Sequence, residues 1–293
     1  MNAAAVAAMM KSTEKTRKTT RFRSGGFFLR ARCAASCASS RSISCSGVWE
    51  SDSISFKVGI QRTASMFGAS SQEKAYLAPF FGFLLIFVLG GAVAHFCDGS
   101  AFWMASAPRY WVYPLQTVVS GALLAQGWRF MEWRAPRGLF APLVVGATAF
   151  ALWIAPQEWL GYALRTEGFD PGYFGASGSP YALNLGLRFL RLVIVVPLIE
   201  EVFWRGFLLR YLIDADFTRV PFGTFSWKSF GVVSVAFCLE HSPPDWPAAL
   251  ATGILYNFLA CRTRNLAACV FAHAVTNLLL GFYVLHTRQW GFW

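Results

Sequence analysis

The sequence predicts an all-α membrane protein, a polytopic helix bundle of about seven spans (six to eight) behind a disordered basic tail. Two observations are compositional: 55% of the 293 residues are hydrophobic and only 14% are charged, whereas a soluble domain averages roughly 45–50% apolar and about 25% charged residues. The third is that the apolar residues gather in runs approaching the roughly 20 residues that cross a bilayer. The composition disfavours a water-soluble enzyme and a chain that is disordered throughout.

The amino-terminal part differs from the rest. Residues 1–75 carry 12 Lys and Arg against 4 Asp and Glu, so we expect a basic tail before a membrane domain at 76–293. Three interpretations of the tail are open: a transit peptide, a disordered cytoplasmic tail, and an over-long gene model whose true start is near Met66. The tail has no recognisable nucleic-acid-binding motif, so no nucleic-acid partner is expected.

Seven apolar runs make up the expected membrane domain. The polar stretch Gln157–Pro180 is the longest expected loop, and basic residues prevail in alternate loops, which places the amino end in the cytoplasm and the carboxyl end outside. The expected spans are Tyr76–Phe96, Tyr110–Trp128, Leu139–Ala155, Tyr181–Ile213, Ser229–His241, Trp246–Cys261 and Leu266–Leu285.

Ionisable residues inside the fourth run are functional candidates, because a charge in the membrane is costly. Glu200 and Glu201 lie near the middle of a single expected helix of about 30 residues. Arg205 follows Glu201 by four positions, so the two share a helix face and can pair. Glu200 points about 100° away, free to face a different cavity. Pro197, one turn earlier, is expected to kink the helix.

The fifth and seventh runs add further polar side chains at helical spacing. Phe237 and His241 are four residues apart, and the helix must stop near Ser242 because two prolines follow. His273 and Asn277 are also four apart, so both can point into the bundle.

Each feature also has a structural interpretation. The Glu–Arg pair can be a structural ion pair, His241 a cap, and the HxxxN pair an interhelical hydrogen bond. Glu240 is expected to cap its helix or face water. Arg188 and Arg191 are expected to snorkel to the interface, with contact to a substrate carboxylate as the alternative. Two glutamates, two histidines and an asparagine on three apolar helices together favour a functional site.

Such a set supports hydrolysis without a Ser or Cys nucleophile. A buried carboxylate can act as a general base toward water, and a nearby histidine can share or orient that water. A second histidine and an amide can stabilise the oxyanion of a tetrahedral intermediate. Binding of a divalent metal by the same side chains stays open as the one cofactor alternative. No metal ligand is assigned, and HExxH is absent.

Three motifs occur in order over about 80 residues and resemble those of the CAAX prenyl endopeptidase and bacteriocin-processing family, whose eukaryotic members are the Ras-converting proteases. These are glutamate-type intramembrane proteases. The resemblance covers a catalytic core at 181–285. The motifs are EExxxR (Glu200, Glu201, Arg205), FxxxH (Phe237, His241) and HxxxN (His273, Asn277).

The resemblance implies a role for each matched position. Glu200 would be the general base that activates water, with His241 assisting. His273 and Asn277 would form the oxyanion site. The supporting residues would be Glu201, Arg205 and Phe237, with direct assistance by Glu201 as the alternative.

The sequence around the motifs, such as EEVFWRGFLLRYL, is similar to the bacterial exosortase-associated branch of that family. This similarity implies a multi-pass protein of the bacterial inner membrane, a membrane protein or peptide as substrate, and a partner from the sorting system. Two other functions stay open: a non-proteolytic binding or self-immunity protein that keeps the motifs, and a proton-coupled carrier that uses Glu200 and His273 as relays.

One difficulty concerns depth in the membrane. Glu200 is expected at mid-membrane, whereas His241 is expected near the outer end of a short fifth span. The mechanism requires the two to meet. Either the fifth helix starts deeper, or the SPPDWP segment dips back into the bundle, which is allowed where protein or water surrounds it.

Overall fold

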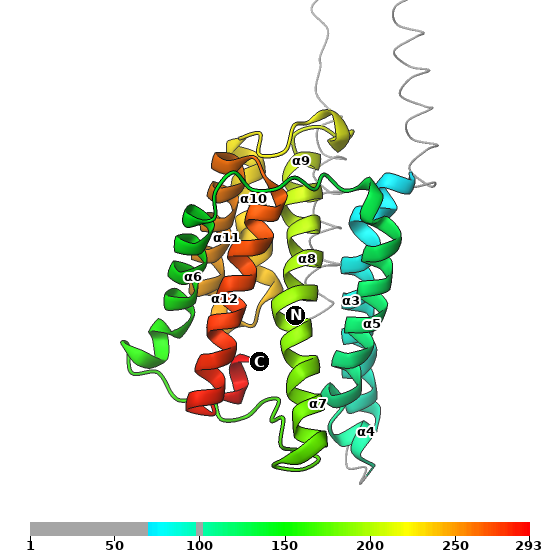
Figure 1. The fold of residues 1–293 in the computed structure, drawn as a ribbon, viewed down its shortest axis with the longest axis vertical. Coiled ribbons are helices and arrows are strands. Elements are labelled where there is room, and N and C mark those ends of the chain that lie inside the picture. Colours follow the sequence, from blue (N-terminus) through cyan, green and yellow to red (C-terminus); the bar gives the residue numbers. More distant parts are fainter. Residues whose placement is uncertain (1–69, 98–101) are drawn as a thin grey trace, which may run out of the picture. The chain divides into compact units, whose positions relative to one another are not determined.

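The computed structural model describes residues 70–97 and 102–293. All regular structure in this part of the chain is helical (Figure 1), which confirms the predicted fold class. The tail interpretations and Met66 lie outside the described residues. The α-helices are α3 (Ser71–Phe96), α4 (Trp103–Ser106), α5 (Arg109–Gly127), α6 (Phe140–Glu158), α7 (Gly178–Phe189), α8 (Val196–Glu201), α9 (Leu209–Tyr211), α10 (Trp227–Glu240), α11 (Trp246–Thr263) and α12 (Leu266–Thr287).

The fourth apolar run forms one continuous helix, Gly178–Tyr211, of 34 residues. Two π-helical segments, η2 (Leu190–Val195) and η3 (Val202–Leu208), lie on either side of α8 within it. Pro197 lies in the first turn of α8. Because a proline ring collides with the carbonyl of the preceding turn, the wider π-helical turn before it provides room. π-Helical turns are frequent at functional sites, and here they flank the two glutamates.

Four described helices are long and apolar enough to cross a membrane: Ser71–Phe96, Phe140–Glu158, Gly178–Tyr211 and Leu266–Thr287. Each of the seven predicted runs is helical, but the count of about seven spans is not confirmed. Helix α10 has only 14 residues and rises about 21 Å, less than the roughly 30 Å of a hydrocarbon core.

The outer surface of the candidate spans is apolar. On α3, Leu85 and Leu89 are exposed, as is Phe140 at the start of α6. Only 17–39% of each candidate span is buried inside the protein. Lipid rather than water is the suitable solvent for such a surface, and the chain is an integral membrane protein.

Close packing of small residues joins α6 to α12. A Cβ atom added to Gly146 would lie 2.5 Å from the carbonyl oxygen of Ala272. The hydroxyl of Thr276 donates to the carbonyl of Gly146 at 2.8 Å. This approach brings α12, and with it His273, against the rest of the bundle. On the other side Phe80 of α3 stacks on Phe203 at 4.0 Å between ring centroids.

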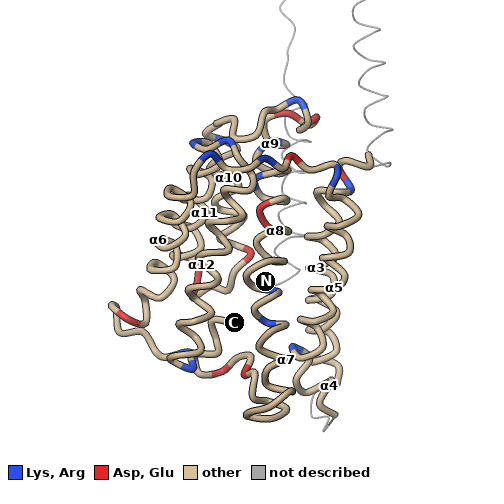
Figure 2. Tube along the Cα trace, in the orientation of Figure 1, with Lys and Arg blue, Asp and Glu red and all other residues tan. Residues whose placement is uncertain are grey.

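Charged residues gather mainly at the end of the bundle where α9 finishes (Figure 2). This end includes Arg129, Arg134, Arg219, Arg262 and Arg264. Their position agrees with the loops in which the sequence places the basic residues, and the cytoplasmic orientation of the amino end stays a prediction.

Arg188 and Arg191 do not snorkel as expected. They lie inside the bundle with exposed fractions of 2% and 8%.

Candidate active site

Glu201 is the most enclosed carboxylate of the predicted site. It is fully buried, and its Oε1 atom accepts from Arg205 Nη1 at 3.0 Å. This is the ion pair that the four-residue spacing predicts. The same Oε1 lies 2.9 Å from His273 Nδ1 on α12. Helices α8 and α12 are therefore joined through a single carboxylate oxygen.

Arg205 is held by further groups that the local spacing does not reveal. Its Nε atom donates to Oδ1 of Asn257 on α11 at 3.1 Å, and Asn257 is itself anchored on α10 through Ser234 Oγ at 3.0 Å. The guanidinium lies over the rings of Phe237 and Tyr256, 4.8 and 5.3 Å from their centroids. Phe237, predicted as a supporting residue, thus contributes a cation–π contact.

Glu200 differs from its neighbour. It is buried, with 8% of its surface exposed, yet no described residue forms a hydrogen bond or an ion pair with its carboxylate. Its charge interacts at longer range with Glu240 and His273. The carboxylate oxygens of Glu200 therefore keep their lone pairs free for water or a substrate.

His241 caps the carboxyl end of α10. Its Nδ1 atom lies 2.8 Å from the carbonyl oxygen of Phe237, and its ring packs on Trp153 at 5.2 Å. A carbonyl can only accept a hydrogen bond, so Nδ1 carries the hydrogen. In the neutral ring, Nε2 is then the basic nitrogen.

The end of α10 lies at the depth of the glutamates. Trp204 Nε1, one turn after Glu200, donates to Glu240 Oε2 at 3.1 Å. Because α10 is short, the turn to α11 lies part-way along the bundle (Figure 1), and most residues of this turn are exposed. The bond between Trp204 and Glu240 places the end of α10 beside the turn that follows Glu200, and a shared water between Glu200 and His241 stays a prediction. Glu240 was expected to cap a helix or face water; instead it is half-buried and bonded to Trp204.

Asn277 meets the backbone of η2. Its Nδ2 atom donates to the carbonyl oxygen of Leu192 at 2.8 Å. In a π-helix each carbonyl accepts from the N–H five residues later, as in the bond from Val196 N–H to Arg191 O. The partner expected for the Leu192 carbonyl is therefore residue 197. This residue is a proline and has no N–H. Asn277 supplies the missing donor. One hydrogen of its amide stays available for another acceptor.

Comparison with known protein families gives one match in this region. Residues 182–279 match the family model described as type II CAAX prenyl endopeptidase Rce1-like. The chain carries an Rce1-like domain. No curated protein and no solved structure matches the chain.

The Rce1-like domain extends from α7 into α12 and includes every predicted site residue. It covers about a third of the chain. The helices before it complete the surroundings of the site, since Trp153 of α6 contacts His241. The family is one of membrane proteases, which makes a membrane peptide or protein the natural class of substrate.

Three residues around the site were not predicted: Trp153, Tyr256 and Asn257. Of these, Asn257 carried a usable signal, a polar side chain in an apolar run. Two aromatic rings in such a run are indistinguishable from core residues.

No group of three His, Cys, Asp or Glu side chains in the described part of the Rce1-like domain is arranged to hold a metal ion. One oxygen of Glu201, Oε2, is buried without a hydrogen-bond partner.

Proposed function

We propose that the protein is an intramembrane endopeptidase that cleaves a membrane-associated protein with water activated by Glu200. The observation that carries the proposal is the contrast between the two adjacent glutamates. Glu201 is neutralised by Arg205 and bonded to His273, whereas Glu200 is buried and unbonded. A desolvated carboxylate without fixed partners is suited to general-base catalysis.

The proposed reaction begins with water between Glu200 and His241. Glu200 removes a proton as the water oxygen attacks the peptide carbonyl, and the C–O bond forms. The oxyanion receives hydrogen bonds from the free N–H of Asn277 and from Nε2–H of His273 in its charged form. As the C–N bond breaks, the proton passes to the departing amine, directly from Glu200 or through His241 Nε2. A carboxylic acid and an amine are the products.

Asn277 would have two tasks in this scheme. One amide hydrogen holds the π-helical turn through Leu192, and the other would face the substrate. Asn277 would support the helix that carries Glu200. The distance between the base and the oxyanion site would then be fixed.

We further propose that the host membrane is a bacterial inner membrane with the amino end cytoplasmic, and that the substrate belongs to a sorting system. The support is the basic loops at one end of the bundle and the similarity around EEVFWRGFLLRYL. Reporter fusions at the two chain ends test the orientation. The expected odd number of crossings requires that the amino end and the carboxyl end lie on opposite sides of the membrane.

The decisive experiment is a cleavage assay on the purified full chain with host membrane proteins. We expect Glu200→Gln and His241→Ala to lower the rate by about 10²–10⁴-fold, the usual contribution of a general base. Glu158→Gln, at the far end of α6, is the matched control and should cleave normally. If Glu200→Gln cleaves as fast as wild type, the mechanism is wrong. A chelator in a parallel arm tests metal dependence.

A further inference from the structure

Two buried arginines, Arg188 and Arg191, lie on the same long helix as Glu200 but outside the catalytic cluster. They are 2% and 8% exposed. Within residues 70–97 and 102–293, no carboxylate forms an ion pair with either of them. By contrast, Arg205 and Arg210, buried on the same helix, each pair with a glutamate.

Several N–H groups of these two arginines donate no hydrogen bond. Nε and Nη1 of Arg188 and Nε of Arg191 are buried without a hydrogen-bond partner. Arg191 Nη2 donates to the neutral Gln116 Oε1 at 3.0 Å. Leaving charged donors unbonded in an apolar interior costs several kcal/mol per ion. Because native proteins bond most buried polar groups, unbonded guanidinium donors point to a ligand.

The surroundings are positive and aromatic. The ring of Tyr113 lies 4.4 Å from the guanidinium of Arg188 and 4.3 Å from that of Arg191. Arg188 interacts electrostatically with Arg191 and Arg109, both of the same sign, and favourably with the side chain of Tyr113. Aromatic faces stabilise the cations in part. A net positive charge nevertheless remains at this point in the bundle.

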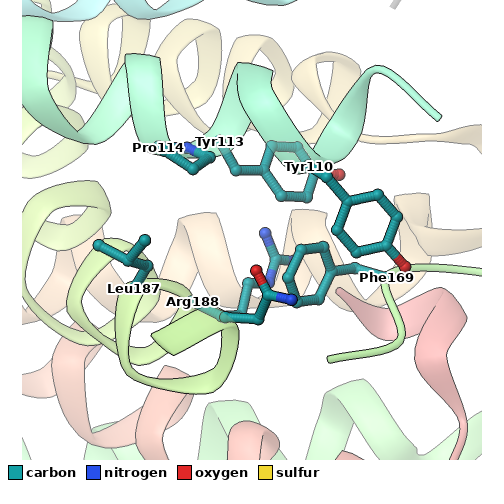
Figure 3. A pocket seen from close by; sticks show the side chains of 7 residues that line it. Tyr110, Tyr113, Pro114, Phe169, Leu187 and Arg188 are labelled. Atoms are coloured by element: carbon teal, nitrogen blue, oxygen red, sulfur yellow. The ribbon is translucent and has the colours of Figure 1, made fainter. Parts of the chain in front are cut away.

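A small pocket opens beside Arg188, between α5 and α7 (Figure 3). The guanidinium points toward Tyr113 and the ring of Phe169, and Tyr110 stands at the side of the pocket. Asn184, one helical turn before Arg188, also lines it. The pocket therefore combines a charged fork, an amide and aromatic walls.

We propose that Arg188 and Arg191 form a carboxylate-binding site that holds an acidic group of the peptide substrate. This inference rests on the proposed peptidase function, since it identifies a class of substrate for the same active site. A carboxylate matches the planar fork of a guanidinium and can accept two hydrogen bonds from it. It would also neutralise the unpaired positive charge.

The positions of the two arginines along the helix set the distance between the carboxylate-binding site and Glu200. Arg191 and Arg188 precede Glu200 by 9 and 12 residues, which is about 13–18 Å at a rise of 1.5 Å per residue. An extended peptide covers about 3.3 Å per residue. The acidic group therefore lies about four to five residues from the scissile bond. The charges of Arg191 and Glu200 already interact across this interval.

The binding test uses the inactive Glu200→Gln protein in neutral detergent, so that it does not depend on cleavage. The probe is a ten-residue apolar peptide with an uncharged fluorophore at its amino end, prepared with a free carboxyl end and as the carboxyl-end amide. We expect the free acid to bind about 10- to 100-fold more tightly than the amide, the range of one charge-assisted pair. Arg188→Met and Arg191→Met should abolish the preference. Arg210→Met is the matched control and should retain it.

Stability supplies a second readout. Because the charge of Arg188 is uncompensated without substrate, Arg188→Met should unfold at the same or a higher temperature than wild type. Arg188→Lys should keep a weaker preference, since it keeps the charge and loses the fork. If Arg188→Met unfolds at a clearly lower temperature, the arginine is structural and the proposal is overturned.

The outcomes separate this proposal from the peptidase function. Equal binding of acid and amide, or binding of neither, overturns the carboxylate site even when cleavage is intact. A clear preference together with an absence of cleavage overturns the peptidase and leaves the site. The same binding assay is repeated in nanodiscs with and without phosphatidylglycerol. If the arginine variants change only the response to that lipid, the ligand is a lipid phosphate and the proposal is wrong.

Discussion

Nδ1 of His273 lies 2.9 Å from Oε1 of Glu201, so a side chain of α12 is bonded to one of α8 across 72 positions of sequence. The same oxygen accepts from Arg205. The contact closes a buried network between helices and removes Glu201 from the set of free bases. Of the two adjacent glutamates, only Glu200 has no hydrogen bond or ion pair to a described residue, which is why we propose it as the base.

Removal of Arg205 should strongly destabilise the bundle. Arg205→Met leaves Glu201 fully buried without its charge partner, and breaking a buried pair costs about 3–5 kcal/mol. Thermal unfolding in detergent should show a large drop in the transition temperature. The double variant Glu201→Gln with Arg205→Met should recover part of the loss, because no buried charge is left unpaired. A single variant as stable as wild type would contradict this prediction.

The proposed catalytic role of His241 Nε2 can be tested separately from the hydrogen bond that Nδ1 donates at the end of α10. His241→Asn keeps an amide N–H near the position of Nδ1 and can still donate to the carbonyl of Phe237, but it has no basic Nε2. We expect cleavage to fall by at least about 10²-fold with little change in the unfolding temperature. Full activity in this variant would show that His241 has only a structural role.

The bond between Trp204 and Glu240 should couple α10 to the long helix. A typical intramolecular hydrogen bond contributes about 0.5–1.5 kcal/mol. A double-mutant cycle with Trp204→Phe and Glu240→Met, followed by thermal unfolding, measures this coupling. Additive effects of the two changes would mean that the contact contributes nothing to stability.

Gly146 should tolerate no larger side chain. A Cβ at this position meets the carbonyl oxygen of Ala272 at 2.5 Å and the side chain of Val275 at 2.9 Å. Gly146→Ala should therefore cost about 1–3 kcal/mol, the usual price of overpacking, and should lower activity by moving α12. The control is Gly121→Ala on α5, where a Cβ meets no atom within 4 Å and helix propensity favours alanine. Equal stability of the two variants would refute the close approach of α6 and α12.

Asn277 offers a test of the π-helical turn. Asn277→Asp removes the amide that bonds the Leu192 carbonyl and places a carboxylate against that oxygen. We expect loss of stability as well as activity, whereas a purely catalytic asparagine would lose activity alone. Thermal unfolding of this variant beside His241→Asn makes the comparison direct.

The helical class, the ion pair of Glu201 with Arg205 and the end of α10 before the two prolines were all predictable from the sequence. These features depend on composition and on spacing within one helix, which fixes which side chains are neighbours. The ordered motifs were also sufficient to indicate the Rce1-like domain.

The partners that come from distant helices become visible only when the helices are packed together. Sequence spacing does not show how deep α10 enters, so it placed Glu240 at a cap or in water and did not predict its bond to Trp204. Likewise, Arg188 and Arg191 are compatible with snorkelling in the sequence, and their burial follows from the packing of α5 against the long helix. The physical reason is that periodicity specifies the face of a helix, whereas the occupant of the space opposite that face depends on how all the helices pack.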